Sequence, residues 1–277
     1  MKSLAERHET FAKLHESGCF VLPNPWDMGS ARVMAANGAK ALATTSAGHA
    51  FALGRPDGGT VSRDEALAHA QDILSATGLP VSGDFENGFG DTPEDVAETV
   101  RRAGEIGLSG CSVEDTIMGT KPGAYDFDLA VERIKAGAAV AKTLGRPFIF
   151  CARADGIMNG VYDTDEAIKR LQAFAAAGAD LLYAPLPPSM DELARIVKSV
   201  SKPVNALVAG DFRQFALTDF AKLGVRRCSL GSSIARLTHY HIVKATQAMC
   251  HEGDFSALKD VASGDMIDEM LRQGADG

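Results

Sequence analysis

The chain has 277 residues, of which 45% are hydrophobic and 23% charged, a composition that suits one large globular domain. Its formal net charge is -8 and it has no basic block, so nucleic acids and acidic membranes are not expected partners. The N-terminus lacks the apolar core of a signal peptide, and no apolar run approaches the ~20 residues that cross a bilayer. The five scattered cysteines are expected to be reduced. These features predict a cytoplasmic protein.

A first helix is expected over residues 4–17, and a unit then repeats along the chain. Each unit has a helix, a short turn that often holds Gly or Pro, a short apolar strand and a loop. Glycine commonly follows the last helical turn, and continuous apolar strands are typical of buried parallel sheets. The pattern predicts eight strands, at residues 20–22, 41–46, 80–85, 111–115, 147–153, 181–185, 203–208 and 227–231.

The helices between these strands have clear start signals. Ser62 with Glu65, and Ser189 with Glu192, have the spacing of capping boxes. Strict β/α alternation favours a (β/α)₈ TIM barrel over a doubly wound sheet, which usually has a Gly-rich phosphate loop after its first strand. We expect one barrel domain over residues 1–277. Residues 253–277 form a C-terminal helical extension that caps the barrel bottom or packs on another subunit.

Acidic residues cluster at the predicted strand ends, where a barrel places its active site. Asp84 and Glu86 stand two residues apart, which puts both carboxylates on one face of a strand, and Glu114 ends the next strand. Like charges held this close need a cation or a proton between them, although solvated loop acids are the alternative. The sequence therefore predicts that all three carboxylates bind Mg²⁺, or Mn²⁺, directly or through water.

Arg153 follows an apolar strand beside these acids, where it suits recognition of a carboxylate or phosphate. The alternative is a structural ion pair with one of the acids. Two loops, residues 48–62 and 115–126, are longer than their neighbours and are interpreted as lids or as surface connectors. Lys121 in the second loop is a candidate for a side chain that closes over substrate.

Several strand-end motifs together resemble the isocitrate lyase and phosphoenolpyruvate mutase superfamily: T-S-A-G-H, R-P-D-G, G-D-F-E-N-G-F-G, S-V-E-D and A-R-A-D. The resemblance extends from residue 24 to about residue 233. It implies a barrel that is commonly tetrameric, with the last barrel helix exchanged between paired subunits. It also implies Mg²⁺ and a 2-oxo acid or its enolate as ligands. We therefore expect a homodimer or homotetramer whose partner is a small 2-oxo acid or dicarboxylate.

The resemblance also assigns roles to individual residues. The metal set falls on Asp84, Glu86 and Glu114, with Asp57 near the water shell of the metal. The substrate contacts fall on the turn at Ser46, Ala47 and Gly48, on Arg153 and on Asn205. Asp57, Arg153 and Lys121 are the candidate catalytic residues.

The chain departs from the superfamily pattern in its lid. Isocitrate and methylisocitrate lyases carry K-[KR]-C-G-H after the fourth strand, whereas this chain reads T-I-M-G-T-K-P-G-A-Y, without Cys or His. The acidic-aromatic-Asn-Ser lid of mutases and phosphonopyruvate hydrolases is also missing. The sequence therefore favours a Mg²⁺-dependent C–C lyase or decarboxylase that acts on a small 2-oxo or dicarboxylic acid through a metal-stabilised enolate. The alternatives are a phosphonomutase or phosphonopyruvate hydrolase, and a non-catalytic 2-oxo acid binding protein.

Overall fold

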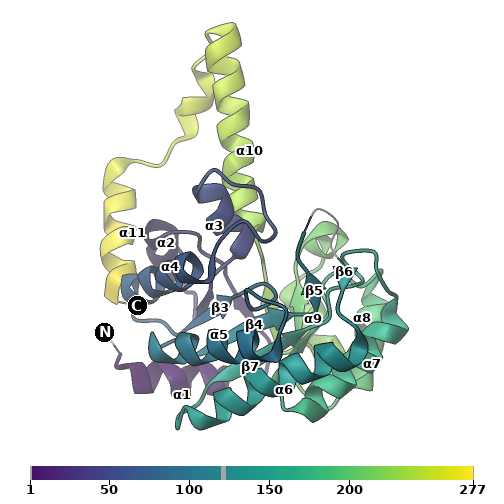
Figure 1. The fold of residues 1–277 in the computed structure, drawn as a ribbon. Coiled ribbons are helices and arrows are strands. Elements are labelled where there is room, and N and C mark those ends of the chain that lie inside the picture. Colours follow the sequence, from purple (N-terminus) through teal and green to yellow (C-terminus); the bar gives the residue numbers. More distant parts are fainter. Residues whose placement is uncertain (1, 120–122, 277) are drawn as a thin grey trace.

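The computed structural model describes residues 2–119 and 123–276, and eight parallel strands form its central sheet (Figure 1). A backbone hydrogen bond of 3.0 Å from Ala43 to Pro23 joins the two ends of the sheet, so the barrel is nearly closed. The predicted (β/α)₈ barrel is confirmed. The strands lie in the order β1 (Phe20–Leu22), β10 (Arg227–Ser229), β9 (Val204–Leu207), β8 (Leu181–Tyr183), β7 (Ile149–Arg153), β4 (Gly110–Glu114), β3 (Val81–Asp84) and β2 (Leu42–Ala43).

Helices follow the strands around the barrel, and a short helix, α3 (Ser46–Ala52), comes directly after β2. The N-terminal helix α1 (Leu4–Leu14) lies under the barrel, where Phe11 is fully buried against Phe20 and Leu22. The helices between the strands are α2 (Met28–Ala36), α4 (Arg63–Ala76), α5 (Pro93–Glu105), α6 (Phe127–Thr143), α7 (Thr164–Ala177), α8 (Met190–Ser199) and α9 (Leu217–Leu223).

Local sequence signals explain where these helices begin. Ser62 and Glu65 form the predicted capping box at α4, with each side chain bonded to the backbone N–H of the other. Ser189 accepts the N–H of Glu192 at α8, but the Glu192 carboxylate pairs with Arg195 at 3.1 Å. Only half of that predicted box therefore forms. In the described ranges every helix is too short or too polar to span a bilayer.

The C-terminal part of the chain leaves the barrel and returns to it (Figure 1). Helix α10 (Ser233–Gln247) projects from the body, a 3₁₀ turn follows at Ser256–Asp260, and α11 (Gly264–Asp276) packs against α2. The packing is close, because a Cβ at Gly274 would lie 1.9 Å from the carbonyl oxygen of Arg32. In the described part of the extension, α11 is its α-helix. It lies on α2 of its own chain and not across the barrel bottom.

The projecting helix α10 exposes large apolar side chains. Leu237, Tyr240 and Ile242 are 54%, 56% and 56% exposed. On the barrel itself, Val21 faces outward from β1 and is 39% exposed. A groove of about 390 Å³ runs along this strand between α2 and the start of α10. The outer face of β1 is thus less covered than the outer faces of its neighbours.

Candidate active site

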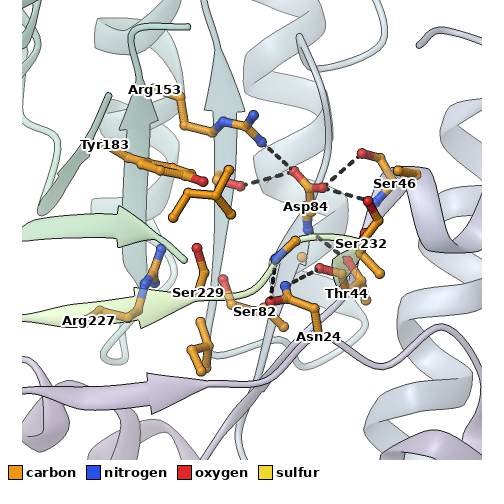
Figure 2. Close-up of a pocket in the computed structure, with 18 of the residues that line it drawn as sticks. Asn24, Thr44, Ser46, Ser82, Asp84, Arg153, Tyr183, Arg227, Ser229 and Ser232 are labelled. Atoms are coloured by element: carbon orange, nitrogen blue, oxygen red, sulfur yellow. Dashed lines mark hydrogen bonds and ion pairs between the residues drawn. The ribbon is translucent and has the colours of Figure 1, made fainter. Parts of the chain in front are cut away.

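A cavity of about 150 Å³ opens at the C-terminal ends of the barrel strands (Figure 2). Typical pockets for drug-sized ligands hold roughly 300–1,000 Å³, so this cavity suits a small metabolite. Asp84, Arg153, Tyr183 and Arg227 line it with the loop residue Asp57. The barrel strands and the loops after them therefore bring together side chains that are far apart in the sequence.

Asp84 is fixed in the cavity wall by contacts from three neighbouring strands and loops. Its Oδ2 accepts hydrogen bonds from the backbone N–H and the hydroxyl of Ser46, both at 2.9 Å. Its Oδ1 accepts from Nη1 of Arg153 at 2.8 Å, and its own backbone N–H donates to Oγ1 of Thr44. The carboxylate of this lining residue therefore has one defined orientation.

Arg153 forms ion pairs with three acids and also faces the cavity. Besides Asp84, its Nη2 lies 2.8 Å from Glu114 and 2.5 Å from Asp155. Burial would lower the pKa of Arg153, but the charges of Asp155, Glu114 and Asp84 more than offset this and raise it well above its usual value. Burial raises the pKa of Glu114 well above normal, although the Arg153 charge acts in the opposite direction. The predicted structural ion pair thus exists, in a residue that also lines the cavity.

Glu86 lies beyond the strand, in a different setting from Asp84. Strand β3 ends at Asp84, and Glu86 has a φ of 44°, in the left-handed region that favours glycine. The two-residue alternation of a strand therefore does not relate these two side chains, which corrects the argument from sequence. Oε1 of Glu86 accepts the N–H of Gly59 at 3.1 Å. Burial raises the pKa of Glu86 to about 7, helped by the charges of Asp84 and Asp57.

The carboxylates do not form a ready-made cage for a metal. In residues 2–119 and 123–276, no three Asp, Glu, His or Cys side chains are arranged to hold an ion together. Arg153 lies between Asp84 and Glu114, and Glu86 turns toward Gly59. The donor chemistry still fits a hard divalent cation, because several acids crowd one guanidinium and raise each other's pKa. Such an ion would be held with water completing its shell.

The turn at the start of α3 contributes two of its three predicted residues to the cavity. Ser46 and Ala47 line it, and the N–H of Ser46 is bonded to Asp84. The N–H of Gly48 instead donates to Oγ1 of Thr45 at 3.2 Å. A Cβ at Gly48 would lie 2.5 Å from Thr45 Cγ2 and 3.1 Å from Trp26 Cβ, so close packing explains this glycine.

Asn205 lies behind the cavity wall and not in its lining. Its side chain is fully buried, its Nδ2 donates to Oγ of Ser229 at 2.9 Å, and its Oδ1 accepts from Nε of Arg227 at 2.7 Å. It therefore holds two lining residues in place. Sequence reasoning missed Arg227, although a charged residue two positions before Ser229 on a strand shares its inward face.

The two long loops meet beside Glu86. The second contains an antiparallel hairpin of β5 (Thr116–Ile117) and β6 (Gly123–Ala124), while Lys121 lies outside the described residues. Met118 of this hairpin contacts the first loop, since a Cβ at Gly59 would lie 3.2 Å from the Met118 Cβ. The contact places both predicted lids on the same side of the cavity.

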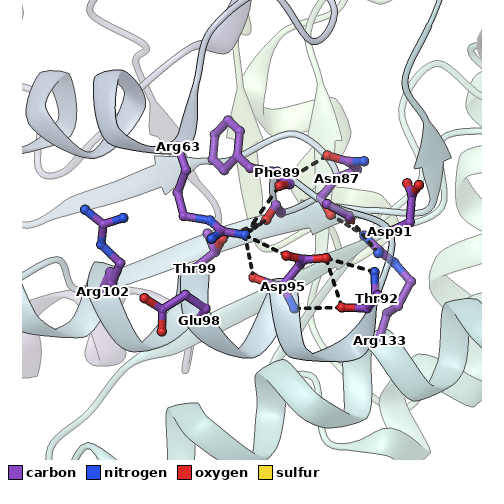
Figure 3. Close-up of polar contacts among 12 residues, drawn as sticks. Arg63, Asn87, Phe89, Asp91, Thr92, Asp95, Glu98, Thr99, Arg102 and Arg133 are labelled. Atoms are coloured by element: carbon purple, nitrogen blue, oxygen red, sulfur yellow. Dashed lines mark hydrogen bonds and ion pairs between the residues drawn. The ribbon is translucent and has the colours of Figure 1, made fainter.

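The loop after β3 is clamped by two arginines from other helices (Figure 3). Arg63 of α4 donates to the carbonyl oxygens of Gly88 and Phe89, both at 3.3 Å. Arg133 of α6 donates to the carbonyls of Gly90, at 2.7 Å, and of Asn87. These bonds satisfy backbone groups in the N-G-F-G turn and fix the segment that carries Glu86.

Comparison with known proteins identifies the family to which this barrel and its acidic strand ends belong. The sequence profile described as phosphoenolpyruvate phosphomutase matches residues 11–250. The chain is a member of the phosphoenolpyruvate mutase family. The predicted isocitrate lyase and phosphoenolpyruvate mutase superfamily is confirmed, and with it the prediction of an enzyme.

Relatives of this phosphoenolpyruvate mutase family member cover most of its length. An uncharacterized protein of Mycobacterium tuberculosis is 35% identical over 227 residues, 80% of this chain and 82% of that protein. The 2-methylisocitrate lyase of Shewanella oneidensis is 29% identical over 225 residues, 78% of this chain and 75% of that enzyme. A crystal structure of a candidate lyase/mutase from Burkholderia cenocepacia is 42% identical, covers 98% of both chains and has a TM-score of 0.93.

Proposed function

We propose that the protein is a Mg²⁺-dependent lyase or decarboxylase that breaks a C–C bond in a small 2-oxo or dicarboxylic acid. The observation that carries the proposal is Asp84, which lines a cavity of about 150 Å³ beside Arg153 and further acids. The surplus of carboxylates over guanidinium groups supports a bound divalent cation. The family relationship supports the reaction class.

The chain's own residues supply binding and charge for this reaction. Asp84 would hold the metal, with Asp57, Glu86 and Glu114 around its water shell. When bound, Mg²⁺ acts as a Lewis acid on the 2-oxo group. Arg153 is already oriented by its three acids, so its guanidinium offers a fixed positive charge to an oxygen that becomes negative in the transition state. The hydroxyl of Ser46 would position the substrate carboxylate.

The composition of the lid limits the types of C–C bond cleavage that the protein could catalyse. Residues 115–126 contain neither Cys nor His, so this loop offers no thiol or imidazole as an acid–base group. Cleavage of a 2-hydroxy acid needs a base to remove the hydroxyl proton. Decarboxylation of a 2-oxo acid with a β-carboxylate does not, because the electrons of the breaking C–C bond pass into the 2-oxo group as CO₂ leaves. Water can then supply a proton to the enolate carbon.

A second candidate is phosphonate chemistry, as a phosphonomutase or phosphonopyruvate hydrolase. The family profile and the candidate lyase/mutase from Burkholderia cenocepacia favour keeping it. A 2-oxo acid binding protein without turnover is the third possibility, because the lid lacks the motifs of both enzyme groups.

One assay separates the three candidates. The purified protein is incubated with Mg²⁺ and, in turn, with oxaloacetate, 2-methylisocitrate and phosphonopyruvate, while pyruvate, phosphate and phosphoenolpyruvate are followed. We expect pyruvate from a carbon substrate, loss of that activity in EDTA and recovery with Mg²⁺ or Mn²⁺. Release of phosphate from phosphonopyruvate, or its conversion to phosphoenolpyruvate, without any reaction of the two carbon substrates would overturn the proposal in favour of the second candidate. Tight binding without turnover would favour the third.

We also propose that the protein is a homo-oligomer in which α10 packs on a second copy. The exposed apolar side chains of α10 support this, as does the groove of about 390 Å³ along the outer face of β1. A helix from another subunit would cover the strand face that this chain's own helices leave open.

A further inference from the structure

Arg227 lies in the wall of the cavity, apart from the acids that surround Arg153 (Figure 2). It is the first residue of β10 and is only 4% exposed. Its Nε donates to Oδ1 of Asn205 at 2.7 Å, which fixes the plane of the guanidinium. Its Nη1 is buried and has no hydrogen-bond partner among the described residues. One nitrogen of a buried cation that lines the cavity is therefore without a hydrogen-bond partner in the described part of the chain.

The two arginines of the cavity differ in their counter-charges. Arg153 pairs with Asp84, Glu114 and Asp155. For Arg227, no ion pair with a carboxylate is found in the ranges 2–119 and 123–276. Arg227 has hydrogen bonds to Asn205 and Cys151 but no carboxylate counter-charge among these residues. A buried guanidinium in this state is costly, and an anion that completes its hydrogen bonds reduces that cost.

The ionisable groups beside Arg227 do not supply this negative charge. Burial raises the pKa of the Cys151 thiol and of the Tyr183 hydroxyl, so both are neutral at pH 7. Burial, followed by the charge of Arg227, lowers the pKa of His15 to about 3, so this imidazole is neutral too. Arg153 adds a second positive charge nearby. None of these groups gives Arg227 a counter-charge, so a ligand in the cavity that it lines is the remaining source of an anion.

We propose that Arg227 binds a second carboxylate of the substrate and makes the protein specific for 2-oxo dicarboxylic acids over 2-oxo monocarboxylic acids. This inference rests on the proposed function, because the first carboxylate and the 2-oxo group occupy the Asp84 and Arg153 side of the cavity. The planar guanidinium matches a carboxylate through paired N–H donors. The cavity volume of about 150 Å³ limits such a substrate to a short carbon chain.

A methyl group in place of the second carboxylate would leave Nη1 unpaired in the complex. Sites that are built to hydrogen-bond a substrate group reject an analogue without that group strongly, by up to roughly 10⁴-fold. Arg227 is therefore a specificity residue, and its loss should affect the choice of ligand more than the binding of the shared 2-oxo acid head.

The test compares three probes that share a head group. Oxalate has no distal group, 3,3-difluoro-2-oxobutanoate carries a methyl group, and 3,3-difluorooxaloacetate carries a carboxylate at the same position. Dissociation constants are measured by calorimetry with Mg²⁺ present. We expect the wild-type protein to bind the dicarboxylate at least about 100-fold more tightly than the methyl analogue. In Arg227→Met this ratio should fall below about 5-fold, with oxalate affinity changed by less than about 3-fold.

Two further variants separate specificity from folding. Arg226→Met is the matched control, because Arg226 is the neighbouring residue and donates to the carbonyl of Gly18 away from the cavity. It should keep the wild-type ratio. Arg227→Lys keeps the charge and should restore part of the preference. If Arg227→Met does not fold, the assignment of Arg227 is tested by comparing the preference for the dicarboxylate over the methyl analogue in Arg227→Lys with that in the wild-type protein.

The outcomes distinguish this inference from the proposed function. If wild-type protein binds oxalate with Mg²⁺ but binds both larger probes equally, the assignment of Arg227 is overturned and the proposed function stands. If oxalate does not bind with Mg²⁺, the proposed function fails and the assignment fails with it. A preference for the dicarboxylate that survives in Arg227→Met would also overturn the assignment.

Discussion

At the scale of single residues, the cavity is organised by unequal charge compensation. Asp84 and Arg153 neutralise each other within a larger acidic group, whereas Arg227 has no carboxylate partner in the described ranges. The acidic positions could be predicted from the sequence, because strand ends converge in any barrel. An ion pair of Arg153 with one acid was among the expectations, but its simultaneous contact with three acids could not be predicted, since side-chain direction at a strand end depends on contacts from other strands.

The first prediction concerns Asp84 as a metal ligand. Asp84→Asn keeps the size of the side chain and removes its charge. We expect Mg²⁺ affinity to fall at least about 100-fold, since even outer groups of a metal site contribute 10–100-fold. Calorimetric titration with Mg²⁺ measures the change. Asp72→Asn, on the exposed surface of α4, is the matched control. Equal Mg²⁺ affinity in Asp84→Asn and wild type would show that the ion binds elsewhere.

The second prediction concerns acid stability and His15, which is 7% exposed under the barrel. Its pKa in the folded protein is about 3, against an ordinary value of 6.5. Between these values the unfolded chain binds a proton that the folded chain does not, so the free energy of unfolding falls as pH drops from 6.5 toward 3. His15→Phe should reduce this slope by about 1 kcal/mol per pH unit below pH 6.

Urea unfolding at pH 7, 6 and 5 measures the slope for wild type and His15→Phe. His241→Phe, at an exposed position of α10, serves as the control and should leave the slope unchanged. His8 and His49 are also buried with pKa values lowered to about 4, so part of the acid sensitivity remains in the variant. Identical slopes in His15→Phe and wild type would mean that His15 binds its proton over the same pH range in the folded and unfolded chains.

At the scale of elements, the helices and strands could be predicted because their signals are local. The box at Ser62 and Glu65 and the alternation of apolar strands with glycine turns depend on neighbours in the chain. The segment after β3 could not be predicted in the same way. Glu86 adopts a left-handed backbone that ends the strand pattern, and distant arginines on α4 and α6 hold the turn that follows.

The third prediction tests this clamp. Arg133→Met removes two hydrogen bonds to carbonyl oxygens of the turn and the stacking of the guanidinium 4.1 Å from the Tyr125 ring. Because Arg133 is 1% exposed, we expect the free energy of unfolding to fall by about 3 kcal/mol. Arg101→Met is the control. Its ion pairs with Glu98 and Glu105 are exposed and should contribute less than about 1 kcal/mol.

Urea unfolding of both variants gives these free energies. The rate of substrate turnover is measured for both variants as well, because the clamped segment includes Glu86 beside the cavity. A decrease in Arg133→Met no larger than that in Arg101→Met would show that the turn holds its shape without the clamp.

At the scale of the whole molecule, the eight-fold repeat could be predicted from the sequence. The projection of α10 away from the barrel could not. Its sequence reads as an ordinary helix after the eighth strand, and it nevertheless projects from the barrel (Figure 1). The resemblance to a family with exchanged helices was the only indication. Local propensity determines that this segment is helical, but the surface against which it packs depends on long-range contacts.

The fourth prediction concerns assembly. Sedimentation of the wild-type protein should give a mass at least twice that of the 29.2 kDa chain. Leu237→Glu combined with Ile242→Glu places charges among the exposed apolar side chains of α10 and should shift the mass toward the monomer. Lys244→Glu on the same helix also changes charge, but at a polar position, and should not. A wild-type monomer at micromolar concentration would contradict the proposed packing.

The uncovered outer face of β1 has a consequence for the behaviour of the protein on dilution. If a helix of a second subunit covers the outer face of β1, that face is shielded from water only in the oligomer. Folding and association are then one coupled equilibrium. The melting temperature should then rise with protein concentration. Newly synthesised chains would expose the apolar outer face of β1 until they associate with a second copy. The lifetime of the folded barrel would therefore depend on the concentration of the protein in the cell.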